Sequence, residues 1–205
     1  MTIVGDVLGR REPRRARSDL VCGITSAELT LQTACGMRFR SAAVAFEPPG
    51  SSLMNAVDNL LEFVGDDSGA SSTRTTDGYG CEWITFSNGP LDDIAIAIGM
   101  VAQRFDAVGC WEHLLCATFA FGAGEDQRSR SRYLVFNFAR SRFYAFVPRG
   151  HGHRDVAEER CHHDALACDL RLETDPQRRY PLWDIPEPAR NGGVAPDFCL
   201  SPSLG

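Results

Sequence analysis

The sequence contains no lysine, so each of its 21 basic residues is an arginine. Its eight cysteines include no CxxC pair, and they are too few in 205 residues for a disulfide scaffold. The longest apolar-rich stretch, Ile94 to Val101, is far shorter than the roughly 20 residues of a membrane-spanning helix. The first residues are apolar and the next are basic, the reverse of a secretory signal. These absences favour a cytosolic protein with reduced thiols.

Motifs of known enzymes are missing as well. The sequence has no GxSxG, HExxH, GxGxxG or P-loop pattern, and DGYG at 77–80 is typical of a turn that leads into a strand. Asp92 and Asp93 lie at an expected helix start, where carboxylates complement the helix dipole. His113 and Cys116 are three positions apart on an expected strand, so they face opposite sides. We therefore expect no enzymatic activity, no catalytic residue, no metal and no cofactor.

Charge is distributed unevenly along the chain. The net charge is −6, but residues 1–17 carry five arginines against Asp6 and Glu12, which gives +3 and leaves −9 for the remainder. An acidic body argues against nucleic-acid binding, which needs a basic face. The N-terminal segment, apolar and then basic, is typical of an arm that docks on a membrane surface or on a partner, although a solvated tail is the alternative. The expected docking residues are Ile3, Val4, Val7, Leu8, Arg10, Arg11, Arg14, Arg15 and Arg17.

The segment RCHHDALAC (160–168) gathers cysteines and histidines on a helix predicted for residues 154–173. A stripe of small or apolar side chains recurs there at intervals of three or four, and it should face the core. Its members are Val156, Ala157, Cys161, Ala165, Cys168 and Leu172. His162 and His163 point in different directions, so they cannot both join Cys161 and Cys168 in one tetrahedral site. We favour structural cysteines with exposed histidines. The alternative is a thiol- or zinc-dependent site that uses Cys161, His163 and Cys168.

The local patterns predict an α+β fold in a single domain, an antiparallel sheet covered by helices. Helices are predicted at 26–34, 51–65, 90–105 and 154–173, and strands at 41–50, 81–86, 113–121 and within 133–148. The expected organisation is an N-terminal arm at 1–17, an α+β domain at 18–186 that ends with YPLWDIP, and a disordered tail at 187–205.

The strand RSRFYAFVPRG (140–150) carries bulky aromatic side chains on both faces. One face should be covered by the core and the other by a helix or by a partner. Buried structure is the simpler explanation. The alternative is a partner-binding strand that uses Arg140, Arg142, Phe143, Tyr144 and Phe146.

Six stretches, taken in order, resemble the PspA-associated PspAB family of actinobacteria and other prokaryotes. They are VGDVLGRR, SAELTLQTACGMRFRSAAVAF, DGYGCEW, HLLCATFAF, YLVFNFARSRFYAFVP and YPLWDIP, and they run from about residue 3 to residue 186. The chain departs from the family pattern at Ala139-Arg140-Ser141, where that pattern has Lys-Arg-Gly, and at Ala145, where it has Pro.

The resemblance implies a cytosolic accessory of the phage-shock, or envelope-stress, system that acts with the membrane-remodelling protein PspA. We therefore expect a non-catalytic adaptor that binds PspA or another envelope-stress protein, with the N-terminal arm on that partner or on the anionic inner face of the membrane. Two other functions stay open: the thiol- or zinc-dependent protein, and a chaperone-like module whose sheet face holds a client segment.

Overall fold

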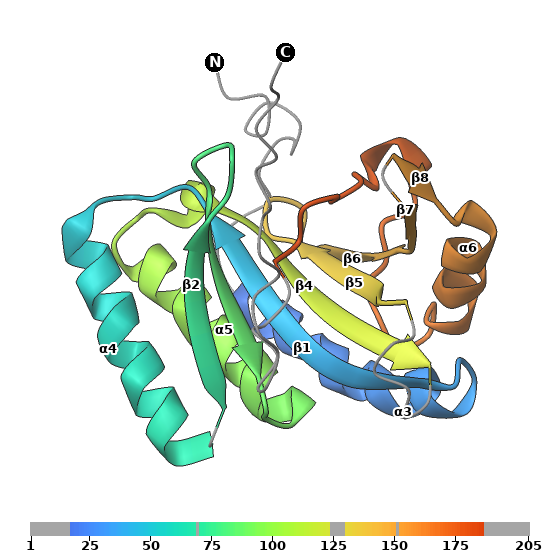
Figure 1. Cartoon of the computed structure of the whole chain (residues 1–205), viewed down its shortest axis with the longest axis horizontal. Coiled ribbons are helices and arrows are strands. Elements are labelled where there is room, and N and C mark those ends of the chain that lie inside the picture. Colours follow the sequence, from blue (N-terminus) through green and yellow to red (C-terminus); the bar gives the residue numbers. More distant parts are fainter. Residues whose placement is uncertain (1–16, 69, 124–129, 151, 187–205) are drawn as a thin grey trace, which may run out of the picture.

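A computed structural model of the chain describes residues 17–68, 70–123, 130–150 and 152–186 (Figure 1). Of the predicted docking residues, only Arg17 falls in these ranges. It is the first residue of a short helix, and its side chain is not described. The other docking residues, at positions 3 to 15, and the tail predicted at 187–205 lie outside the described residues.

A six-stranded sheet in the order β2-β3-β1-β4-β5-β6 forms the middle of the described part, and all neighbouring strands are antiparallel. The strands are β1 (Met37–Phe46), β2 (Ser71–Thr76), β3 (Glu82–Ser87), β4 (Leu114–Ala123), β5 (Arg132–Asn137) and β6 (Arg142–Phe146). The two longest strands, β1 and β4, pair with each other at the centre. The predicted antiparallel α+β fold is confirmed.

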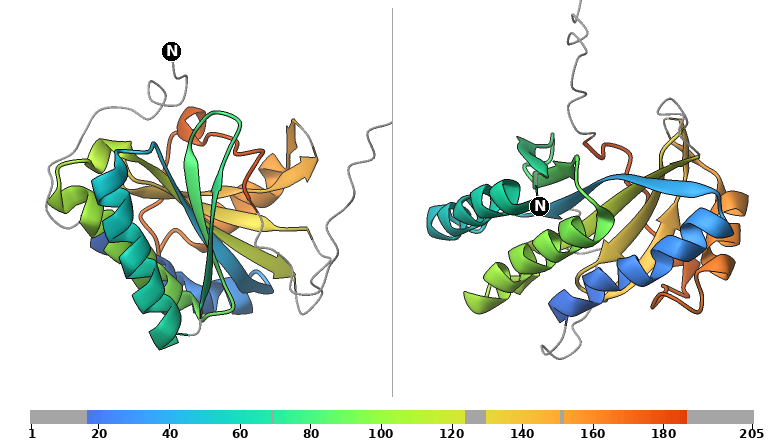
Figure 2. Two further views of the ribbon diagram at one scale, coloured as in Figure 1. Left: turned by 60° about the vertical axis from the view of Figure 1, so that its left-hand side comes forward. Right: turned by 90° about the horizontal axis from the view of Figure 1, so that it is seen from below.

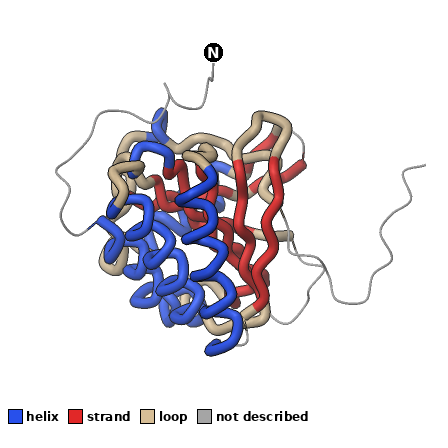
Figure 3. The backbone as a smooth tube through the Cα atoms, turned by 90° about the vertical axis from the view of Figure 1, so that its left-hand side faces the viewer, coloured by secondary structure: helices blue, strands red, loops and turns tan. Residues whose placement is uncertain are grey.

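Helices cover one face of this sheet, as the end-on and side views show (Figures 2 and 3). They are α2 (Arg17–Val21), η1 (Cys22–Ala27), α3 (Glu28–Thr33), α4 (Ser51–Ser68) and α5 (Leu91–Ala107). Side chains alternate between the two faces along each strand, and every second one packs into the core beneath these helices. Phe46 of β1, for example, meets Phe105 of α5 with ring centroids 5.1 Å apart.

Helix α5 follows from its sequence. Pro90 precedes it in an extended conformation, and Asp92 and Asp93 occupy the first turn, where their charge complements the helix dipole. Its buried large side chains recur at intervals of three or four residues, the spacing that puts them on one side of a helix. They are Leu91, Ile94, Ile98, Val101 and Phe105.

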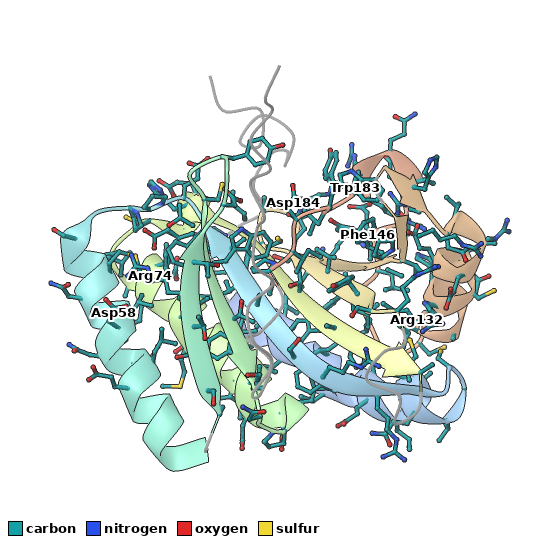
Figure 4. All side chains as sticks on the ribbon, in the orientation of Figure 1. Asp58, Arg74, Arg132, Phe146, Trp183 and Asp184 are labelled. Atoms are coloured by element: carbon teal, nitrogen blue, oxygen red, sulfur yellow. The ribbon has the colours of Figure 1, made fainter. Side chains whose placement is uncertain are left out.

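The hairpin between β2 and β3 depends on Asp77. Its carboxylate accepts hydrogen bonds from the backbone N–H groups of Tyr79 and Cys81, both at 2.9 Å, and from Trp83 Nε1 at 3.0 Å. Gly80 in the same turn has φ +84°, a conformation that favours glycine. The turn predicted from DGYG is thus confirmed. On β2, Arg74 reaches Asp58 of α4 at 3.3 Å (Figure 4).

The C-terminal part of the described chain packs beside β6. It contains β7 (Pro148–Gly150), β8 (His153–Arg154), α6 (Val156–Ala165) and η3 (Pro176–Arg178). Phe143 N–H donates to Arg171 O at 2.9 Å, and Glu173 N–H donates to Phe143 O at 2.7 Å. This segment therefore continues the hydrogen bonding of the sheet beyond β6.

Candidate partner-binding surface

The face of the sheet opposite the helices has small side chains in the middle and large ones at both sides. The central strands β1 and β4 contribute alanine, cysteine and threonine, whereas β3 contributes a tryptophan and β5 and β6 contribute aromatic rings. We call this surface the strap face. Its members are Ala43, Ala45, Trp83, Thr85, Cys116, Thr118, Ala120, Tyr133, Val135, Tyr144 and Phe146, and all of them are buried.

A short segment of the chain, Pro181–Pro186, lies on the strap face, and we call it the strap. Leu182, Trp183 and Ile185 are half-buried and pack against the apolar side chains of that face. The Trp183 ring meets the Phe146 ring edge-on, with centroids 5.3 Å apart and planes at 74° (Figure 4). Figure 1 shows the strap (orange-red) in front of the sheet, with α3 and α5 behind it. The second aromatic face of β6 is thus covered by the chain itself.

Two side chains hold the residues just before the strap. The Tyr144 hydroxyl donates to Tyr180 O at 2.9 Å. Burial raises the pKa of Tyr144 well above its ordinary value, so the phenol keeps the proton that it donates. The Arg154 guanidinium lies over the Phe146 ring, 5.6 Å from its centroid, and donates to Arg179 O at 2.7 Å. These contacts fix the chain up to Tyr180.

The five residues of the predicted partner-binding strand all have partners within the chain. Arg140 Nε donates to Glu173 Oε2 at 2.5 Å, and Arg142 donates to Leu172 O at 3.0 Å. Phe143 is 2% exposed and packs in the core on the helical side. Tyr144 and Phe146 face the strap. The structure therefore covers both faces of β6, as the aromatic pattern indicated. A role of these side chains in binding a partner stays a prediction.

Helix α6 corrects two predictions from the sequence. The helix ends at Ala165, well before residue 173, and the stripe that was expected to face the core is largely in solvent: Val156 is 65% exposed, and Cys161 and Cys168 are also exposed. Its buried side chains are Glu159 and His162 instead. The histidines are accordingly not exposed as predicted, since His162 is buried and His163 is half-buried.

The reason lies in the hydrogen bonds of Glu159. Its carboxylate oxygens accept from Arg154 Nε at 2.9 Å, and Oε1 also accepts from the buried Val147 N–H at 2.9 Å. The hydrogen bonds of Glu159 favour burial of its side of the helix. The opposite stripe consists mostly of alanine and cysteine, whose small side chains gain little free energy from burial. The Asp155 carboxylate caps the same helix by accepting from the Glu158 N–H at 3.1 Å.

The described cysteines and histidines do not build the zinc form of the alternative site, and its thiol-dependent form stays a prediction. Among the described residues no group of three or more His, Cys, Asp or Glu side chains is placed to hold a metal ion, so Cys161, His163 and Cys168 form no zinc site there. Burial raises the pKa of Cys116 to about 12, and it also raises the pKa of Cys22, Cys35 and Cys81. These four thiols are therefore poor sources of thiolate.

The residues that sequence reasoning missed are those of the strap. Leu182, Trp183 and Ile185 are three large apolar residues between two prolines, and that composition is the signal that could have indicated a docked segment.

Within the described ranges, no helix is both long and apolar enough to cross a membrane. A family model described as PspAB, PspA associated protein B, matches residues 1–187. Comparisons with curated proteins and with solved structures give no match.

Proposed function

The chain belongs to the PspA-associated protein B family, and from this membership we propose that it is a non-catalytic accessory of the PspA envelope-stress response. The proposed partner is PspA or another protein of that system. The family match, which covers nearly the whole chain, is the observation that carries the proposal. Its location would be the cytoplasm, with a peripheral position at the inner face of the membrane when it is docked.

Charge supports a division of labour between the arm and the body. Residues 1–17 have a net charge of +3 and residues 18–205 have −9. An anionic membrane surface attracts basic residues by about 1 kcal/mol each when they lie close to it, and it repels an acidic body. We propose that residues 1–17 dock, either on anionic lipid or on the partner, and that the body faces the cytoplasm.

Cell fractionation tests this docking. The full chain and an Ile3→Asp/Val7→Asp double variant are produced in cells under membrane stress, and the protein in the membrane fraction is measured. The double variant should lose most of its membrane recovery, because two carboxylates replace the apolar side chains that enter the interface.

The matched control is a Val108→Asp/Val156→Asp double variant. These valines are 57% and 65% exposed on the body, so the substitutions add the same charge without touching the arm. The control should fractionate like the unchanged protein. Equal membrane recovery of all three proteins would contradict docking by the arm.

A second candidate function, the chaperone-like module that holds a client segment, is supported by one observation. The strap face carries a segment of the chain itself, seated by Leu182, Trp183 and Ile185. A sheet face that accommodates one extended apolar segment is suited to accommodate another.

A further inference from the structure

The strap is held by packing alone. Within the part of the chain that the structure describes, residues 181–186 take part in no hydrogen bond and no ion pair. Pro181 and Pro186 have no N–H group to donate. The preceding segment differs, because Arg179 Nε donates to Glu173 O at 3.1 Å and Tyr180 O accepts from Tyr144. The strap can therefore leave the sheet from a fixed point at Tyr180 without breaking a hydrogen bond.

The strap face cannot stay uncovered once the strap leaves. Phe146 is fully buried and Tyr144 is 2% exposed, and both contact the strap segment or the residue before it. Exposed apolar area of this kind is unfavourable in water and marks binding surfaces. A departing strap must be replaced by another apolar segment, so its departure and the binding of a replacement are coupled.

The chemistry of the replacement follows from the strap itself. The Trp183 ring packs against the Phe146 ring of β6, while Leu182 and Ile185 pack against the apolar side chains of the strap face. Thr85 adds a polar requirement: it is 4% exposed on this face, and its Oγ1 has no hydrogen-bond partner in the described structure. A buried hydroxyl without a partner is unfavourable. A segment with a polar group near β3 would satisfy it, which the strap does not.

We propose that the strap face is a binding site for an extended segment of a partner protein, and that the strap occupies this site in competition with that segment. The segment presents an aromatic side chain between two aliphatic ones, as Trp183 is placed between Leu182 and Ile185, together with a polar group for Thr85. This inference rests on the second candidate function, the sheet face that holds an extended segment, and it does not depend on the N-terminal arm or on association with PspA.

Peptide binding to the full-length protein tests the inference. The probe is the fluorescein-labelled heptapeptide YPLWDIP, the sequence of residues 180–186, and binding is measured by fluorescence anisotropy. The unchanged protein should bind it weakly, because the tethered strap is present at a high effective concentration. A Trp183→Ala variant has a weakened strap, so it should bind the peptide at least tenfold more tightly.

Two controls separate replacement of the strap by the peptide from non-specific binding of the peptide. Tyr79→Ala removes an aromatic side chain that is 73% exposed and distant in the sequence from the strap, and it should bind the peptide as weakly as the unchanged protein. The peptide YPLADIP lacks the aromatic side chain and should bind Trp183→Ala at least tenfold more weakly than YPLWDIP. Circular dichroism and thermal unfolding establish that each variant is folded.

Equal affinities of the unchanged protein and Trp183→Ala for YPLWDIP would overturn the inference, as would equal binding of the two peptides. Light scattering after gel filtration addresses a different occupant. A dimer of the unchanged protein that becomes a monomer in Trp183→Ala would assign the strap face to a second copy of this chain, and it would overturn the assignment to a partner protein. Monomers in both cases support the proposal.

Discussion

Breaking the ion pair between Arg154 and Glu159 should cost more stability than breaking an exposed pair. The Glu159 side chain is 4% exposed and the Arg154 side chain 21%. Removing one partner of a buried pair costs about 3–5 kcal/mol, and leaving the buried Val147 N–H without its acceptor adds about 1–3 kcal/mol. Arg154 keeps some contact with solvent and still donates to Arg179 O, which places the total at the low end. We expect Glu159→Ala to lower the free energy of unfolding by about 4 kcal/mol.

For a chain of this length, about 4 kcal/mol corresponds to a fall of roughly 8–16 °C in Tm. Urea unfolding and calorimetry of the full chain measure both quantities. Glu159→Gln keeps an acceptor for Val147 and should lose less. Arg178→Ala breaks a pair whose side chains are 47% and 39% exposed, so it should change stability by about 0.5 kcal/mol or less. A loss below about 1 kcal/mol for Glu159→Ala would refute the argument that this pair fixes α6.

Two further predictions concern Ser141 and His162. Ser141 has φ +53°, and its buried hydroxyl lacks a hydrogen-bond partner in the described structure; Ser141→Gly should therefore raise stability by about 1 kcal/mol, the relief of backbone strain exceeding the extra entropy of the unfolded chain. A urea midpoint that stays unchanged or falls would show that this strain is absent. Burial lowers the pKa of His162; the nearby carboxylates of Glu158, Asp155 and Glu159 act to raise this pKa, and the Arg132 guanidinium acts to lower it. Because the unfolded chain then binds the proton more readily than the folded chain, stability is lost as the pH falls below about 6.5. Unfolding between pH 8 and pH 5 should show a smaller loss for His162→Gln than for the unchanged protein, and equal losses would exclude His162 as a source.

Local sequence patterns were sufficient to predict the structure where the apolar residues of a helix or strand are the residues that the fold buries. Helix α5 combines a preceding proline, acidic residues in the first turn and apolar side chains, so its sequence predicts its position. The Phe143 to Phe146 pattern correctly indicated that both faces of β6 are covered. The sequence could not show that the cover on one face is the chain itself, because this depends on a contact between residues about 40 positions apart.

Local signals failed where tertiary partners decide. The buried side of α6 is set by hydrogen bonds from Arg154 and the Val147 N–H to Glu159. The spacing of apolar residues along a helix does not reveal such partners. The strap has too little regular structure for any periodic signal, since it has prolines at both ends and no hydrogen bonds among the described residues. Its place on the sheet follows from the rings of Phe146 and Trp183, which only the folded chain brings together.

Association with PspA is the central claim, and affinity capture from membrane-stressed cells tests it most directly. The full chain serves as bait beside the Ile3→Asp/Val7→Asp and Val108→Asp/Val156→Asp variants, and PspA in the captured material is quantified. We expect PspA to be recovered with the full chain and with the control variant, and to be reduced with the arm variant if the arm docks on that partner. Failure of the full chain to recover PspA or any other envelope-stress protein would contradict the proposed function.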